Sequence, residues 1–560
     1  MKTPKQSTSR ASLVWTPARV LGALVLAGLL LRVLLLNFRF AVGFDEVNYL
    51  KLGVSAHLHG MPAALHTYWS PFFPWLVAWL CSFTDNYELA GRLVSVAAGA
   101  LLPLPVYALG KLHVDKTAGL IAAAFAAFFP PLAFQATAAL TEATYMLLVA
   151  LAVLSGWMML KRYSLTAALL SGLLAGCLYL TRPEGFGFLL IFAAWIVAGS
   201  LFKLYLIRPL RMLYLLLALG TGFVAVATPY LIFLHGRTGT WTLSAKGAAN
   251  LQMDTPEDGS RPSFRSLSAD NSSVPIDQVF HEGNFLKGDS ASKGAVAGVS
   301  VKGLAIKYAG NMYDLIKTAI PSFLTMLPLM FLGIGLLGVS WQWGQGRKNI
   351  YFLSFVCCYW FVVVPLFHIN ARYFTPMWPI CAVWIAGGAH TVFRWLREHE
   401  ALARFATARK VQPATLAIGL LLGLALAFSF LPEIGRILAR RSTSTDRWAD
   451  AVELKQAGLW IRQQGAAPPV IMSRNHAVSF YAGNYDVHQS VTIPENSLDR
   501  ILEYAHHRGA RYLVLSERYT SEYPQLAWLL HTAPPLQGLK RVYEHAEAPG
   551  LLTVVYEMQE

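Results

Sequence analysis

An acidic pair beside the first long apolar stretch is where chemistry is first expected in this chain. Residues 20–36 are almost all apolar, and Asp45 and Glu46 follow shortly after them. A carboxylate so close to a membrane span is costly unless it has a function. On a helix, Asp45 and Tyr49 share one face whereas Glu46 points about 100° away, so the two acids are expected to have different partners. The simpler alternative is an ordinary polar helix end at the membrane surface.

Two more polar stretches interrupt the apolar segments further along the chain. In the first, Arg182 and Glu184 flank a helix-breaking proline between two apolar runs. The alternative to a functional role is that Arg182 and Glu184 pair with each other and hold a tight hairpin, and in either case they are predicted to shape the cavity. In the second, His368 precedes the pair Arg372 and Tyr373. A guanidinium beside a phenol hydroxyl suits a phosphate at the membrane surface, and the alternative is an interfacial anchor.

The remaining charged positions are weighed in the same way. Glu142 lies near the end of its apolar segment and is predicted to face protein or water instead of lipid. Arg92, just inside the second long apolar segment, is predicted to face the helix bundle or to snorkel to the interface. His57 and His59 crowd one short segment with His66, but the first two would diverge on a helix, so a metal site is not favoured there.

The composition of the whole chain is that of a protein with many membrane spans. Hydrophobic residues make up 55% of the 560 positions and charged residues only 14%, against roughly 25% in soluble domains. The formal net charge is +15, but many of the Lys and Arg lie in short loops between apolar segments, a pattern that sets membrane orientation and does not indicate nucleic-acid binding. The five cysteines lie in apolar stretches without metal-ligand spacing.

The apolar segments predict a mainly helical, polytopic membrane protein with about 11 to 13 spans. The first run has no cleavage site and is expected to stay as an anchor. A cytoplasmic N-terminus would place every basic loop on the cytoplasmic side, and the acidic pair and the chain after residue 434 outside. The segments lie near 18–38, 88–110, 117–134, 139–160, 165–181, 184–202, 211–234, 317–340, 349–367, 372–393 and 413–433.

The chain is predicted to divide into a transmembrane catalytic domain, residues 1–434, and a C-terminal α/β domain, residues 435–560. Within the first, residues 41–87 form an external loop with short helices along the membrane interface, because its apolar runs are too short to span. Residues 235–316 form a long polar external loop, either disordered or functional. After residue 440, short apolar runs alternate with helical patterns, which is typical of a soluble α/β unit.

Taken in order, the polar motifs resemble the GT-C superfamily of lipid-carrier-dependent glycosyltransferases, in particular the aminoarabinose-transferase and protein-O-mannosyltransferase-like group. The resemblance covers about the first 400 residues. The motifs that carry it are Asp45-Glu46-x-x-Tyr49, Trp69-Ser70-Pro71, Arg92-Leu93, Leu140-Thr141-Glu142, Arg182-Pro183-Glu184-Gly185 and Ala371-Arg372-Tyr373.

The resemblance implies an active site at the periplasmic face of a bacterial inner membrane and a polyprenyl-phosphate-linked sugar as donor. The acceptor would be lipid A, a glycan or a protein. Some relatives need a divalent cation and others do not, and this sequence shows no convincing ligand set. By the family's pattern, the catalytic acids are Asp45 and Glu46, and the donor phosphate and carrier are bound by Arg372, Tyr373, Arg182 and Tyr49, with Glu142, Glu184, Arg92 and His368 in support.

The chemistry also fits the residues alone. A polyprenyl phosphate is already a good leaving group, so transfer needs one base for the acceptor's proton, Asp45, and cations for the phosphate, Arg372 with Arg182. Direct displacement would invert the anomeric carbon. The rival hypotheses are a transporter or flippase for the lipid-linked sugar, a ligase for whole glycans, and a non-catalytic membrane subunit. A transporter predicts charges near mid-membrane and repeated halves, whereas most of the charges here lie at one face.

Overall fold

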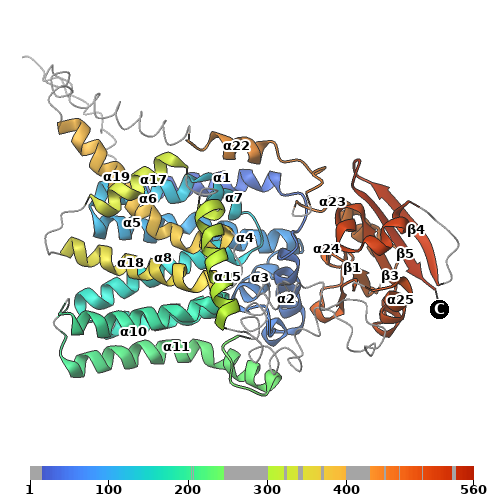
Figure 1. The fold of residues 1–560 in the computed structure, drawn as a ribbon, viewed down its shortest axis with the longest axis horizontal. Helices are drawn as coiled ribbons and strands as arrows, with labels where there is room; N and C mark the ends of the chain where they lie inside the picture. Colours follow the sequence, from blue (N-terminus) through green and yellow to red (C-terminus); the bar gives the residue numbers. More distant parts are fainter. Residues whose placement is uncertain are drawn as a thin grey trace, which may run out of the picture.

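A bundle of helices makes up most of the protein, and a mixed sheet region near the C-terminus lies at one end of it (Figure 1). His368, most of the predicted 235–316 loop and most of the predicted 413–433 span lie outside the described residues. The computed structural model describes residues 16–244, 301–320, 325–338, 345–366, 371–398 and 429–559, except positions 204, 206, 447, 448, 466, 495 and 532–537.

The predicted apolar segments up to residue 393 all fall on helices, and five helical stretches in the described chain are long and apolar enough to cross a membrane. Other apolar helices are shorter, so the exact number of spans stays a prediction. The five are Pro17–Phe38 (α1, Pro17–Leu35, and the 3₁₀ turn after it), Tyr87–His113 (α4, Tyr87–Leu101, with α5, Pro103–His113), Thr141–Arg162 (α8), Pro183–Leu201 (a 3₁₀ turn and α10, Phe186–Leu201) and Pro209–Thr238 (α11). The bundle also contains α6 (Lys116–Phe128), α7 (Pro130–Gln135), α9 (Leu165–Thr181), α15 (Val301–Asp314), α17 (Met326–Leu337), α18 (Gln345–Val363) and α19 (Trp378–Glu398).

Local sequence explains where these helices begin and how closely they pack. Helices α1 and α11 start at Pro17 and Pro209, and proline favours the first helical position because its fixed φ suits the helix and its missing amide is not needed there. Helices α9 and α11 approach each other at Gly172 and Gly222. A Cβ on Gly172 would lie 2.0 Å from the Leu219 carbonyl oxygen, so only glycine allows this contact. Inside α1, Arg32 is fully buried and faces the bundle.

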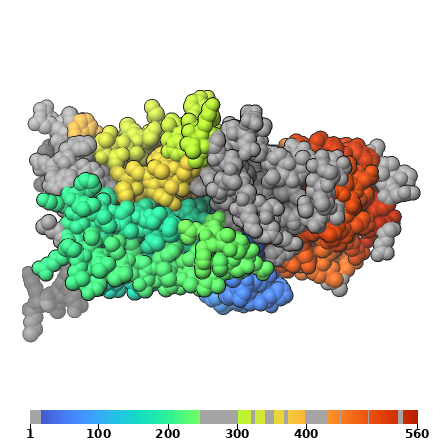
Figure 2. All heavy atoms as spheres, turned by 60° about the horizontal axis from the view of Figure 1, so that its bottom comes forward, coloured from blue at the N-terminus to red at the C-terminus, as the bar shows by residue number. Residues whose placement is uncertain are grey.

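Two short helices, α2 (Glu46–His59) and α3 (Phe72–Cys81), connect the bundle to the C-terminal region. Their predicted position along the membrane interface stays a prediction. Most of α2 is buried in the protein, from Glu46 to Val54, because its apolar side packs on α3 and α4 and its polar side meets the C-terminal region. Figures 1 and 2 show this blue segment between the helix bundle and the orange-to-red C-terminal region.

The predicted C-terminal α/β unit contains a five-stranded mixed sheet with the strand order β2-β1-β3-β5-β4. Strands β2, β1 and β3 are parallel, and β5 pairs antiparallel with both β3 and β4. The strands are β1 (Ile471–Ser473), β2 (Ser490–Val491), β3 (Tyr512–Ser516), β4 (Leu539–Ala546) and β5 (Leu552–Met558), and the helices are α22 (Leu431–Leu438), α23 (Val452–Gln463), α24 (Ala477–Tyr481) and α25 (Leu498–His507).

Candidate functional site

A cavity of about 390 Å³ collects most of the residues that the sequence singled out. It opens where the start of α2, the start of α8, the turn between α9 and α10, and the chain before α19 meet. The predicted residues that line it are Asp45, Tyr49, Glu142, Arg182, Glu184, Arg372 and Tyr373.

Asp45 and Arg372 form a direct ion pair, although 327 residues separate them in the chain. Asp45 is the N-cap residue of α2, so it lies at the N-terminal end of the helix and not within it. The Arg372 Nε atom also lies 3.8 Å from Glu142 Oε1. One guanidinium therefore lies between two carboxylates that line the cavity.

Arg182 contacts two carboxylates, that of Glu184 and that of Glu142, which also lies near Arg372. Its Nε atom lies 2.6 Å from Glu184 Oε1 and its Nη1 atom 3.5 Å from Glu142 Oε1. Burial alone would lower the pKa of Arg182, but the Glu184 and Glu142 carboxylates raise it above the usual value, so the side chain keeps its charge. The contacts agree with both predictions for this turn: Arg182 pairs with Glu184, and both residues line the cavity.

Tyr49 and Tyr373, the two predicted tyrosines of the cavity, each make a contact through the aromatic ring. The Tyr49 ring packs edge-on against Trp69, with 5.0 Å between ring centroids, and against Phe73 at 5.6 Å. Burial raises the pKa of the Tyr49 hydroxyl, so it stays protonated and can act as a hydrogen-bond donor. The Tyr373 ring lies 5.2 Å below the Arg182 guanidinium, a contact that holds the cation in place.

Apolar side chains also line the cavity. They include Phe186, Val363 and Val364, together with Leu190 of α10, which is 54% exposed. A cavity lined by two guanidinium groups and by apolar side chains suits an amphipathic ligand that carries a phosphate.

Two predicted residues do not line the cavity. Glu46 accepts a hydrogen bond from the Ala139 amide at 2.9 Å, and burial raises its pKa even though Arg39 and Arg92 lie near it. Arg92 does not snorkel, because it donates to the carbonyl oxygens of Arg39 and Ala41 at 3.2 and 3.0 Å. A catalytic role for Glu46 stays a prediction, and its place outside the cavity does not support it. The contacts do fit the expectation that Asp45 and Glu46 have different partners.

Sequence reasoning did not single out Tyr359 in α18, whose hydroxyl donates to the Glu184 carbonyl oxygen at 2.6 Å at the edge of the cavity. A tyrosine inside an apolar run gives no signal that could have found it. Among the described residues, no group of three or more His, Cys, Asp or Glu side chains could hold a metal ion. The carboxylates of the cavity face guanidinium groups, so this donor set does not fit a divalent cation as it stands.

Comparisons with known proteins were made in sequence and in structure. Residues 67–233 match the family of dolichyl-phosphate-mannose-protein mannosyltransferases. No curated protein matches the chain in sequence.

Solved structures with the same fold include two enzymes of lipid-linked sugars. ArnT from Cupriavidus metallidurans, bound to undecaprenyl phosphate, is 14% identical with a TM-score of 0.58, over 95% of this chain and 97% of that one. The oligosaccharyltransferase of Archaeoglobus fulgidus in its apo form is 14% identical with a TM-score of 0.57, over 90% of this chain and 70% of that one. The same archaeal enzyme, AglB, with an inhibitory peptide and a dolichol-phosphate has a TM-score of 0.54 at 14% identity, over 96% and 74% of the two chains. Over residues 67–233 the chain therefore resembles the dolichyl-phosphate-mannose-protein mannosyltransferases in sequence, and along most of its length it shares the fold of ArnT and of the archaeal oligosaccharyltransferase.

Proposed function

We propose that this protein transfers a sugar from a polyprenyl-phosphate-linked donor to an acceptor at the external face of the membrane, with Asp45 as the general base. The observation that carries the proposal is the meeting of Asp45 with Arg372 and Arg182 in one cavity that apolar side chains also line. ArnT was solved with undecaprenyl phosphate and AglB with a dolichol-phosphate, and a carrier of that class fits this cavity. The acceptor is lipid A, a glycan or a protein.

The proposed reaction needs no second acid. An acceptor oxygen attacks the anomeric carbon while the bond from that carbon to the phosphate oxygen breaks, and the electron pair of that bond leaves on the phosphate. The acceptor's proton goes to the Asp45 carboxylate. Arg372 and Arg182 stabilise the negative charge of the departing phosphate, and attack from the opposite side inverts the anomeric carbon.

The ion pair between Asp45 and Arg372 gives the donor a second role. A base that is bound to a guanidinium is a poor proton acceptor, because the positive charge favours the carboxylate form. A phosphate competes for the same bidentate donor. Donor binding would therefore release Asp45 from Arg372 at the moment when the base is required.

Transfer by purified protein tests this function. Asp45→Asn keeps the size and the hydrogen-bonding shape but cannot take a proton, so sugar transfer from a labelled lipid-linked donor in nanodiscs should fall at least about a hundredfold. Donor binding should persist. Near-normal transfer by Asp45→Asn would defeat the mechanism, and movement of intact donor across the bilayer by the wild type, without cleavage, would favour a flippase. Donor binding with neither cleavage nor movement would point to a non-catalytic subunit.

The orientation and the domain division remain part of the proposal. A cytoplasmic N-terminus, with the cavity and the region after residue 434 on the periplasmic side of a bacterial inner membrane, is supported by the basic loops between the apolar segments. Residues 1–434 would supply the catalytic cavity and residues 435–560 a separate external domain.

A further inference from the structure

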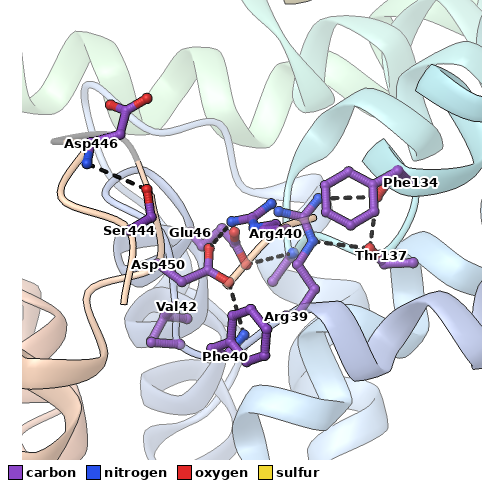
Figure 3. Close-up of polar contacts among 12 residues, drawn as sticks. Arg39, Phe40, Val42, Glu46, Phe134, Thr137, Arg440, Ser444, Asp446 and Asp450 are labelled. Atoms are coloured by element: carbon purple, nitrogen blue, oxygen red, sulfur yellow. Dashed lines mark hydrogen bonds and ion pairs between the residues drawn. The ribbon is translucent and has the colours of Figure 1, made fainter. Parts of the chain in front are cut away.

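The segment that leads from α1 into Asp45 is held by the C-terminal region. The Asp450 carboxylate accepts a hydrogen bond from the Phe40 amide at 2.8 Å (Figure 3). The Tyr481 hydroxyl accepts one from the Val42 amide at 2.9 Å, and the Lys455 ammonium donates to the Phe40 carbonyl oxygen at 3.1 Å. Three backbone groups of Phe40 and Val42 thus find their partners more than 400 positions away.

Asp450 is itself held firmly. Its side chain is only 4% exposed and forms an ion pair with Arg440. The Arg440 guanidinium lies 5.1 Å from the centre of the Phe134 ring, and the Arg39 guanidinium lies 4.0 Å from the same ring (Figure 3). The partly buried ion pair and the two cation–π contacts leave the carboxylate little freedom to move away from Phe40.

The Tyr481 hydroxyl belongs to a closed network. It donates to Glu88 Oε2 at 2.9 Å, and Lys455 contacts the same oxygen at 3.1 Å. Glu88 pairs with Arg92 at 2.7 Å, and Arg92 returns to the segment by donating to the Ala41 carbonyl oxygen. Both polar groups of the peptide unit between Ala41 and Val42, together with the Phe40 carbonyl oxygen, are therefore bound by side chains that belong to this network.

An apolar core surrounds this network. Val42 and Leu50 pack in one buried cluster with Val452, Phe480 and Tyr481. The cluster therefore belongs to both the first external segment and the C-terminal region, and burial of this kind resists small shifts because protein interiors are close-packed.

The constraint extends to Asp45. A Cβ on Gly43 would lie 2.9 Å from Glu46 Oε1, so the chain passes close to this carboxylate, and the Arg474 guanidinium lies 4.8 Å from the centre of the Phe44 ring. Glu46 is in turn anchored on the Ala139 amide. Asp45 therefore follows a segment whose neighbouring residues make contacts on both sides of it in the chain.

We propose that the C-terminal region sets the position of Asp45 in the cavity, with Tyr481 and Asp450 as positioning residues that act through the backbone of Phe40 to Val42. The inference rests on the proposed function, because it assigns a task to the same base. Neither residue lines the cavity, so their effect on catalysis comes only through the segment they hold.

Tyr481→Phe is the sharpest test, because it removes one oxygen atom and leaves the packing of the ring. Tyr523→Phe is a matched control: the Tyr523 hydroxyl is buried and makes two hydrogen bonds to Ser516, at 2.9 and 2.6 Å, inside the C-terminal sheet region. Two measurements are made on full-length protein in nanodiscs, amide hydrogen exchange of a peptide that covers residues 39–46 and sugar transfer at varied donor concentration.

In Tyr481→Phe, exchange at residues 40–46 should rise about tenfold or more, the scale expected for an orphaned buried amide. The kcat should fall about tenfold with the donor KM unchanged, because a misplaced base weakens the transition state and not donor binding. Tyr523→Phe should change neither quantity. Exchange at residues 40–46 that stays at the wild-type level would overturn the proposal, as would raised exchange with normal kcat.

A failure of the proposed function would look different. If the wild type transferred no sugar, the transfer assay would reject Asp45 as a base, and with it the task assigned to the C-terminal region, whatever the exchange showed. Wild-type transfer combined with an unchanged Tyr481→Phe variant would reject the positioning role alone.

Discussion

Replacing Arg372 would test whether this residue holds the donor phosphate, as we propose. Its guanidinium pairs with Asp45 and lies 3.8 Å from Glu142 Oε1, and its side chain is 31% exposed toward the cavity. Arg372→Lys keeps the charge but loses the planar fork, so one of two charge-assisted hydrogen bonds to the phosphate is lost. Such a bond contributes about 1.5–3 kcal/mol, and each 1.36 kcal/mol changes a rate about tenfold. The donor kcat/KM should therefore fall roughly 10- to 100-fold.

Arg372→Ala removes the charge as well and should cost about a hundred- to a thousandfold, the scale for losing a donor that stabilises a developing anion. The assay is transfer from a labelled lipid-linked sugar by protein in nanodiscs at varied donor concentration. Arg511→Ala serves as control, because Arg511 is 54% exposed and forms its ion pair with Glu557 on the C-terminal sheet, far from the cavity residues in the chain. Normal kcat/KM in Arg372→Ala would remove this residue from the phosphate site and refute the reasoning.

Two further predictions concern Glu46 and the orientation. Burial raises the pKa of Glu46, so the folded protein holds this proton more tightly than the unfolded chain, and the resulting stability is lost as the pH rises through the folded pKa. In thermal unfolding in detergent from about pH 4 to pH 8, the stability of Glu46→Gln should increase relative to that of the wild type as the pH rises. A stability difference between the two proteins that does not change with pH would contradict this. A reporter fused after Arg440 should be external and one fused at Lys161 cytoplasmic, so both on the same side would contradict the orientation.

The polar residues of the cavity could be found from the sequence because charge is rare and costly near membrane spans. Asp45, Arg182 and Arg372 stand out for this reason, and all three line the cavity. The direct ion pair of Asp45 with Arg372 could not be predicted, because nothing local links positions that lie 327 residues apart.

The contacts between the C-terminal region and the segment before Asp45 could not be predicted from the sequence, for a different reason. Asp450 and Tyr481 lie in a stretch with ordinary soluble composition, where a polar side chain carries no special signal. The burial of α2 depends on contacts of the same kind, whereas its position along the membrane interface stays a prediction. The mixed sheet itself was predictable in kind, because short apolar runs such as 512–515 alternate with helical patterns.

The contacts between Phe40 and Asp450 and between Val42 and Tyr481 also bear on how the protein is made. Their partners are 410 and 439 residues apart, so at about 5–20 residues per second a ribosome needs roughly 20 to 80 seconds to supply Asp450 after Phe40 has emerged. During that time the first helices can enter the membrane, but the segment before Asp45 lacks the groups that fix it. A chain interrupted before residue 450 would thus hold every residue that lines the cavity but lack the groups that bind Phe40 and Val42, so on our proposal its Asp45 would not yet be in position.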